Sequence, residues 1–244
     1  MSASGYEQHL KSEHRVGDVA SFLKEIVYGG NDGIVTTFAV VAGFAGAGAE
    51  GAAAVGTIAV LLFGLANLLA DATAMGLGAF LSSRSERDVY MANRAKELHE
   101  IEHNAEYERA EAIEILQAKG VSEADANGFA DLYQRNPELM ADFMMQYELG
   151  MADPREDNPA MNGLATFLAF ILFGSIPLIP YFLMAPTVET FHASVAATAL
   201  ALVLLGTLRW YVTRENLMRS VGETVLVGGT CAVIAYAVGL AFSG

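Results

Sequence analysis

Five long apolar segments and one long polar stretch set the layout of the chain. The apolar segments cover residues 26–49, 52–81, 161–184, 191–212 and 221–242, and the polar stretch covers residues 82–160. Each apolar segment has about the 20 residues that a membrane-spanning helix needs. Backbone in lipid must satisfy its own hydrogen bonds, which favours helices. The pattern therefore predicts an all-α, polytopic membrane protein with five transmembrane helices. Pro177 and Pro180 lie near the end of the third, where a kink or a helix end is tolerated.

The basic residues indicate how these helices are oriented. Three of the 14 precede the first apolar segment, eight lie in the polar stretch, and three lie at the end of the fourth segment or between it and the fifth. Basic residues concentrate on the cytoplasmic side of membrane proteins. We therefore expect residues 1–24 to be a cytoplasmic N-terminal segment and residues 82–160 to be a cytoplasmic domain. Residues 25–81 then carry helices 1 and 2, residues 161–244 carry helices 3–5, and the C-terminus lies on the far side.

The composition narrows the class of protein further. The 244 residues are 53% hydrophobic with a mean hydropathy of +0.36, and the formal net charge is −14. An acidic chain lacks the basic patches of nucleic-acid-binding proteins, but it attracts cations. The single cysteine, Cys231, excludes an intrachain disulfide framework and a thiolate zinc site. Residues 1–24 lack the apolar core of a cleavable signal peptide, and a bacterial inner membrane is the simplest expected location.

Within the polar stretch we expect three helices that together form one acidic domain. The first extends the second membrane helix and runs over residues 83–119. Ser122 with Asp125 resembles a capping box and predicts the start of the second helix. Pro137 after Asn136 is typical of a first helical turn and predicts the start of the third.

The acidic residues of this domain form the first candidate site. Residues 82–160 hold 18 of the 28 acidic residues, and a helix brings residues three and four apart onto one face. The candidate metal ligands are Glu97, Glu100, Glu108, Glu111, Glu114, Met144 and Glu148. A straight helix would hold Glu97 and Glu111 about 21 Å apart. Either two sites form along it, or the helix breaks around His103–Asn104 and folds back. A solvated acidic helix face is the alternative.

Polar residues inside the predicted membrane helices form the second candidate site. A carboxylate in the hydrocarbon region costs at least about 2.5–3.5 kcal/mol, so it usually faces a bundle interior or a wet path. Asp32 is such a residue, and its flanking glycines let a backbone or a ligand come close. Asn67, Asp71 and Met75 share one face of the second helix, and oxygen donors with a thioether favour transition metals. The alternative is a set of structural polar contacts between helices.

Several short motifs in this order carry a resemblance to a known family. They are Gly30-Asn31-Asp32-Gly33, Met75-Gly76-Leu77-Gly78, Ser85-Glu86-Arg87-Asp88, Asp142-Phe143-Met144-Met145 with Glu148-Leu149-Gly150, Ile176-Pro177-Leu178-Ile179-Pro180-Tyr181 and Leu226-Val227-Gly228-Gly229. With this hydropathy the chain resembles the vacuolar iron transporter family over nearly its whole length. The resemblance implies a homodimer of five-helix subunits that exchanges cytosolic Fe²⁺, and sometimes Mn²⁺, for protons. It implies no enzymatic activity and no cofactor besides the transported ion.

The resemblance also implies roles for particular residues. Asp32 and Met75 would line the route of the ion. The cytoplasmic domain would bind metal through Glu97, Glu100, Glu108, Glu111, Met144 and Glu148, with Glu102, His103 and Glu114 as neighbouring alternatives. The chain departs from the family at Asn67, where many relatives carry a glutamate and Asp71 is the possible substitute one turn on. It departs again at Ser21, which aligns with an expected glutamate, while Glu25 lies one turn later.

Residues and resemblance together predict a transporter that exports Fe²⁺ from the cytoplasm in exchange for protons. The acidic domain would capture the ion and pass it to a path at the subunit interface lined by Asp32 and Met75. One alternative is a manganese exporter, because oxygen-rich sites also suit Mn²⁺. Another is a membrane-anchored iron-binding or storage protein without transport. A ferroxidase of the ferritin type would need paired Glu-x-x-His motifs, and only Glu100–His103 supplies one.

Overall fold

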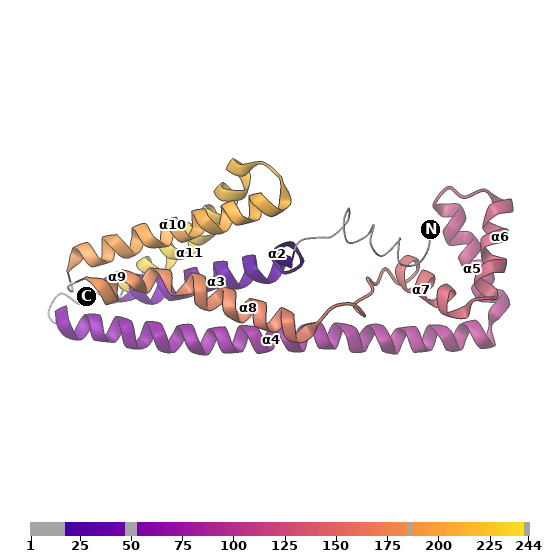
Figure 1. The fold of residues 1–244 in the computed structure, drawn as a ribbon, viewed down its shortest axis with the longest axis horizontal. Helices are drawn as coiled ribbons and strands as arrows, with labels where there is room; N and C mark the ends of the chain where they lie inside the picture. Colours follow the sequence, from indigo (N-terminus) through magenta and orange to yellow (C-terminus); the bar gives the residue numbers. More distant parts are fainter. Residues whose placement is uncertain (1–17, 47–52, 185–186, 242–244) are drawn as a thin grey trace. The chain divides into compact units, whose positions relative to one another are not determined.

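The computed structural model describes residues 18–46, 53–184 and 187–241, and all regular structure within these ranges is helical (Figure 1). This confirms the predicted all-α class for the described residues. The chain separates into two compact units. The apolar unit comprises the described residues up to Phe80 and from Ala160 onward, and the polar unit comprises Leu81–Pro159.

Within the described ranges, four helical segments are long and apolar enough to cross a membrane, which makes this a multi-pass membrane protein. They are the apolar part of α4 (Ala53–His103), the segment Pro159–Leu183, α10 (Val188–Thr213) and α11 (Leu217–Ala241). The second of them is interrupted at its prolines, and it consists of α8 (Pro159–Gly174), the 3₁₀ helix η1 (Ile176–Leu178) and α9 (Ile179–Leu183). Four of the five predicted membrane helices are thereby confirmed as candidate spans.

The remaining predicted membrane helix is α3 (Leu23–Gly46), which follows the short α2 (Asp18–Ser21). Its 24 residues are long enough to cross a membrane. Asn31 and Asp32 lower its hydropathy, and α3 is not among the four apolar spans. Its place as a fifth membrane helix stays a prediction.

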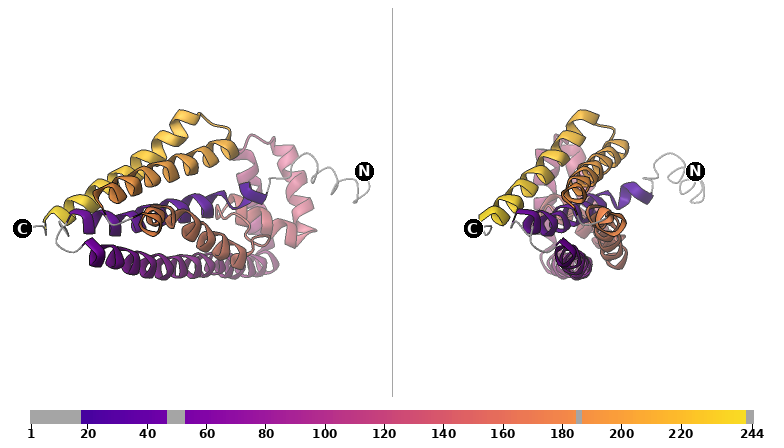
Figure 2. Two further views of the ribbon diagram at one scale, coloured as in Figure 1. Left: turned by 60° about the vertical axis from the view of Figure 1, so that its left-hand side comes forward. Right: turned by 90° about the vertical axis from the view of Figure 1, so that its left-hand side faces the viewer.

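Two apolar clusters hold the apolar unit together, and α3 contributes to both. One joins α3 to α4, α8 and η1 through buried residues that include Phe38, Leu68 and Phe170. The other joins α3 to α10 through Ile34 and Leu205. Figure 2 shows α3 between the α10–α11 pair and α4. The helix that carries Asp32 is therefore an inner helix of its unit.

Glycines let α3 and α4 approach α8 closely. A Cβ atom on Gly33 would lie 2.5 Å from the carbonyl oxygen of Phe170, and one on Gly163 would lie 2.6 Å from the carbonyl oxygen of Gly76. Both clashes are with backbone, so no side-chain rotation relieves them. Gly43, further along α3, has open space at the same position. The packing therefore requires glycine at Gly33 and Gly163, but not at Gly43.

The polar unit consists of the end of α4 followed by α5 (Ala105–Ala118), α6 (Glu123–Gln134) and α7 (Pro137–Tyr147). The prediction of one helix over residues 83–119 is wrong, because the helix breaks at Asn104 (φ −127°, ψ 36°). Asparagine is a weak helix former and a favoured helix N-cap. The Asn104 carbonyl oxygen accepts hydrogen bonds from the N–H groups of Tyr107 and Glu108 and so begins α5. Four helical segments stand where three were predicted.

The predicted starts of the last two helices of this unit are confirmed. Ser122 precedes α6 as its N-cap, and its Oγ accepts a hydrogen bond from the Asp125 N–H at 3.2 Å. Pro137 is the first residue of α7, after Asn136. The four segments pack around an apolar core that includes Ile101, Ala112 and Met140.

Replacing Gly33 with alanine should destabilise the apolar unit by about 1–3 kcal/mol, because an extra methyl group in a tightly packed contact forces the two backbones apart. Gly43→Ala on the same helix is the matched control, and it should be neutral or mildly stabilising because alanine is the better helix former. Melting temperatures of the two variants in detergent measure the difference. Equal melting temperatures would contradict the close approach of α3 to α8.

Candidate metal centre

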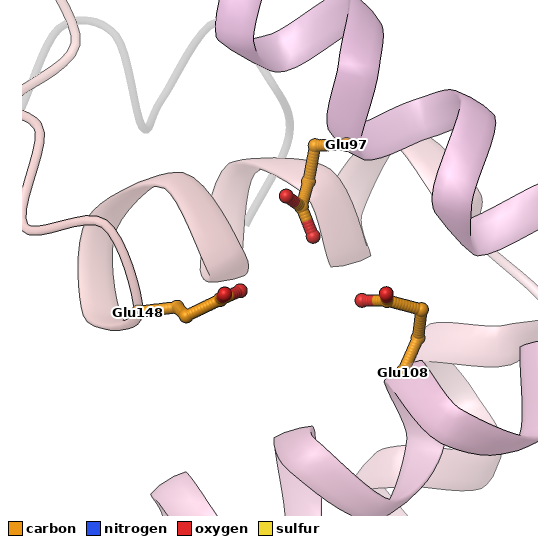
Figure 3. Close-up of side chains that lie close together, drawn as sticks. All are labelled: Glu97, Glu108 and Glu148. Atoms are coloured by element: carbon orange, nitrogen blue, oxygen red, sulfur yellow. The ribbon is translucent and has the colours of Figure 1, made fainter. Parts of the chain in front are cut away.

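Three glutamates from separate helical segments meet in the polar unit (Figure 3). Glu97 lies on α4, Glu108 lies on α5, and Glu148 directly follows α7 as its C-cap. One carboxylate oxygen of each lies within 4.8 Å of the other two, and the carboxyl groups point toward one another. Among the described residues this is the one such group of three histidine, cysteine, aspartate or glutamate side chains. We call these three residues the carboxylate cluster.

The break at Asn104 makes the carboxylate cluster possible. On a straight helix, Glu97 and Glu108 would lie about 16 Å apart along the axis, at 1.5 Å per residue. The chain instead turns at Asn104, so α5 places Glu108 beside Glu97. Of the two arrangements that the sequence left open, the structure contains the folded-back one. Glu148 then closes the group from the end of α7.

Two members of the cluster are buried, and each has one carboxylate oxygen without a hydrogen-bond partner. The side chains of Glu97 and Glu108 are only 6% and 2% exposed, whereas Glu148 is exposed. Glu97 Oε1 and Glu108 Oε2 accept no hydrogen bond. A buried carboxylate without a compensating partner is costly, and such a group takes up a proton or a cation. The cluster is therefore a place where positive charge is favoured.

Burial and the repulsion between neighbouring carboxylates raise the pKa values of the three cluster members. Glu97 lies well beyond residue 81, where the apolar segment of α4 ends, and burial together with the charges of Glu148 and Glu108 raises its pKa to about 8. Burial also raises the pKa of Glu108, although its hydrogen bond with Glu97 acts in the opposite direction. Burial and the charges of Glu111 and Glu100 raise the pKa of Glu148. At neutral pH Glu97 therefore keeps its proton, and a divalent cation would compete with that proton for the same oxygen atoms.

The other predicted ligands of this domain lie near the cluster or in the apolar core of the polar unit. Glu100 and Glu111 are close enough for their charges to raise the pKa values of cluster members, but they are outside the group of three. Met144 is fully buried in the apolar core of the polar unit, one turn before Glu148. The structure thus gathers three of the six predicted residues. The neighbouring alternatives Glu102, His103 and Glu114 are exposed.

Sequence reasoning missed Arg94, which ties α7 to α4. This arginine is 8% exposed, and its Nε donates a hydrogen bond to Asp142 Oδ1 at 2.7 Å. Its Nη2 donates to Glu138 Oε2 at 2.5 Å, and Arg155 pairs with the other oxygen of Asp142 at 2.9 Å. Arg94 is thus fixed one turn before Glu97 and holds the helix that leads to Glu148. Its spacing of three from Glu97 was the only signal, and it does not reveal burial.

The second candidate group lies in the apolar unit. Asn67 Nδ2 donates a hydrogen bond to Asp71 Oδ2 at 2.8 Å, which confirms that the two residues share a face of α4. The charge of Asp71 acts on Asp32 of α3, so the two carboxylates are neighbours. Met75 is partly buried against the apolar cluster around Phe38. The apolar unit therefore contains an oxygen-rich group made of Asp32, Asn67 and Asp71.

Glu97→Gln should flatten the dependence of the melting temperature on pH in metal-free protein. Glu97 keeps a proton in the folded state up to about pH 8, but releases it near its ordinary value of 4.5 when unfolded. The folded state therefore binds more protons between these values, and stability falls as the pH rises through this window. Melting temperatures from pH 4.5 to 9 with a chelator present measure the effect. Glu114→Gln, at an exposed position, is the control, and parallel wild-type and Glu97→Gln profiles would contradict the prediction.

Arg94→Met should loosen α7 from α4 by about 1.5–3 kcal/mol, the usual contribution of a hydrogen bond to a charged group. Amide hydrogens of α7 should then exchange about 10–100 times faster, because each 1.4 kcal/mol is a factor of ten. Hydrogen–deuterium exchange read by mass spectrometry resolves α7 from the rest. Arg84→Met is the control, since Arg84 is exposed and its nearest acidic partner is 4.0 Å away. Unchanged exchange in α7 would show that Arg94 does not anchor it.

Comparisons with known proteins show the family to which the chain belongs. The model of the VIT family matches residues 23–240. Vacuolar iron transporter 1 of Arabidopsis thaliana is 31% identical over 230 residues, which cover 94% of this chain and 88% of that protein. Vacuolar iron transporter 1 of Tulipa gesneriana is 32% identical, covering 95% and 90%. The vacuolar iron transporter of Toxoplasma gondii is 34% identical, covering 93% and 76%. The chain therefore belongs to the VIT family.

Proposed function

We propose that this protein transports divalent transition-metal ions across a membrane, and that it exports Fe²⁺ from the cytoplasm in exchange for protons. Its relatives are named as iron transporters, which supports a metal-ion transporter rather than an enzyme and indicates no cofactor. The observation that carries the proposal is the carboxylate cluster, in which two buried glutamates have unpartnered oxygen atoms. Such a group has chemistry suited to catching a cation before transport.

In this proposal the polar unit captures the ion on the cytoplasmic side. Glu97, Glu108 and Glu148 supply the first oxygen ligands, and an arriving divalent ion replaces the proton that the raised pKa of Glu97 retains. Oxygen ligands suit Fe²⁺ and Mn²⁺. Glu100 and Glu111 add negative charge at the edge of the cluster, and we propose them, with Met144, as further ligands.

The apolar unit would provide the path. We propose α3 as the fifth membrane helix, with the N-terminus in the cytoplasm, and a homodimer in which the path lies at the subunit interface. Asp32, Asn67, Asp71 and Met75 would line it, supported by the Asn67–Asp71 hydrogen bond and by the proximity of Asp32 to Asp71. Protonation of these carboxylates on the far side would release the ion, because metal and proton compete for the same oxygen atoms.

A manganese exporter is the second candidate function. The carboxylate cluster offers only oxygen donors, which suit Mn²⁺ as well as Fe²⁺. Competition between the two ions in a flux assay separates these functions. A storage protein without transport would bind iron in detergent while liposomes containing it stay impermeable to the ion.

Fe²⁺ flux into liposomes that contain the full chain tests the proposal, with a metal-quenched dye inside and an imposed pH gradient. Asp32→Ala should abolish flux at every Fe²⁺ concentration, because it removes a carboxylate from the path. The double variant Glu97→Gln/Glu108→Gln should instead raise the Fe²⁺ concentration for half-maximal flux at least about tenfold, which corresponds to about 1.4 kcal/mol of lost binding.

Glu156→Gln, an exposed position of the polar unit, is the control for the double variant and should leave flux unchanged. Melting temperatures show that each variant is folded. Flux that survives Asp32→Ala would remove this residue from the path. Flux that is indifferent to the pH gradient would rule out proton exchange.

A further inference from the structure

Two histidines form a separate cluster near the end of α4. His99 and His103 are one helical turn apart, both side chains are exposed, and the centroids of their rings lie 4.0 Å apart with an angle of 38° between the planes. At 100° per residue, His99 points about 200° away from Glu97 around the helix. This pair therefore lies on a different face of α4 from the carboxylate cluster.

We propose that His99 and His103 form a second metal site, which chelates a divalent ion that prefers imidazole ligands: Cu²⁺, Ni²⁺ or Zn²⁺. Two histidines at positions i and i+4 of a helix are a known arrangement for holding such an ion. Imidazole nitrogen suits these ions, whereas the carboxylate cluster offers only oxygen. The site goes beyond the proposed iron transport and does not depend on it.

The hydrogen bond of His103 prepares its ring for a metal. His103 Nδ1 lies 2.8 Å from the carbonyl oxygen of His99. A carbonyl oxygen only accepts hydrogen bonds, so Nδ1 carries a proton and Nε2 is the ring nitrogen left to bind a metal. Metal-binding histidines usually donate their other N–H group to a carbonyl or carboxylate in this way, which fixes the tautomer and the ring orientation. The hydrogen bond thus leaves Nε2 of His103 directed away from the backbone contact and available as a ligand atom.

The distance between the rings suits a shared ion. A metal–nitrogen bond is about 2.0–2.1 Å long, and an angle of about 90–109° at the ion then places the two nitrogen atoms about 3 Å apart. With ring centroids 4.0 Å apart, the two rings are near enough for one nitrogen of each to reach a shared ion after the side chains rotate. Because both side chains are exposed, water can fill the remaining coordination positions.

Charge also favours a cation at this position. α4 ends at His103, and the C-terminal end of a helix carries a partial negative charge that stabilises a nearby cation. Glu102, between the two histidines, is exposed and adds a further negative charge. A metal bound by both histidines would link the two ends of the last turn of α4, directly before the break at Asn104.

Copper binding to the full chain, purified in detergent without a histidine tag, tests the proposal. The chain has five histidines, so the variant His9→Gln/His14→Gln/His192→Gln keeps only His99 and His103. With one equivalent of Cu²⁺, its electron paramagnetic resonance spectrum should show coupling to two imidazole nitrogens. Adding His99→Gln or His103→Gln should leave coupling to one and weaken Cu²⁺ binding at least tenfold.

Two further results decide between this site and its alternatives. Glu97→Gln/Glu108→Gln in the same background should keep the two-nitrogen spectrum, so loss of iron capture and loss of this site are distinguishable. Melting temperatures of the histidine variants should match that of their background, because both side chains are exposed. A spectrum without imidazole coupling, or one unchanged by His99→Gln and His103→Gln, would mean adventitious copper only and would overturn the proposal.

Discussion

The constraint on which the polar unit depends is the burial of two carboxyl groups side by side with too few partners. Glu97 and Glu108 are removed from water, and each has an oxygen atom without a hydrogen bond. Two negative charges at this distance in a poorly solvated site repel each other strongly. The arrangement is stable only with positive charge between them, as protons or as a cation. One feature therefore sets the protonation state, the pH dependence of stability and the affinity for cations.

The polar unit also contains a buried charge that is paired with oppositely charged side chains. Arg94, one turn from Glu97, is as deeply buried, but it is paired with Asp142 and Glu138. Those charge-assisted hydrogen bonds compensate its desolvation. They also fix α7, whose last turn leads to Glu148. The paired arginine supports the framework, and the incompletely paired glutamates are the groups that we propose as metal ligands.

The sequence predicted those features that depend on local rules. The apolar segments, the cap at Ser122 and the start of α7 at Pro137 follow from hydropathy, side-chain capping and a fixed φ angle, and the structure contains them. The break at Asn104 was only one of two arrangements, because asparagine is tolerated within helices at a modest cost. Arg94 was missed since its burial arises from packing against a helix more than 40 residues away. Long-range pairing is not encoded in local spacing.

Helix α3 combines a low hydropathy with a position inside its unit. Asn31 and Asp32 lower the hydropathy that would mark α3 as a membrane helix, yet α3 packs in both apolar clusters of its unit. A polar residue in an inner helix is costly unless it meets other polar groups. Asp32 has Asp71 as a neighbour, and Asp71 accepts a hydrogen bond from Asn67. An ion path through a membrane requires polar residues of this kind, whereas helix faces that contact lipid exclude them. Among the five predicted membrane helices, α3 is the one that hydropathy marks least clearly as a span. The same helix carries Asp32, the strongest candidate for lining a conducting path.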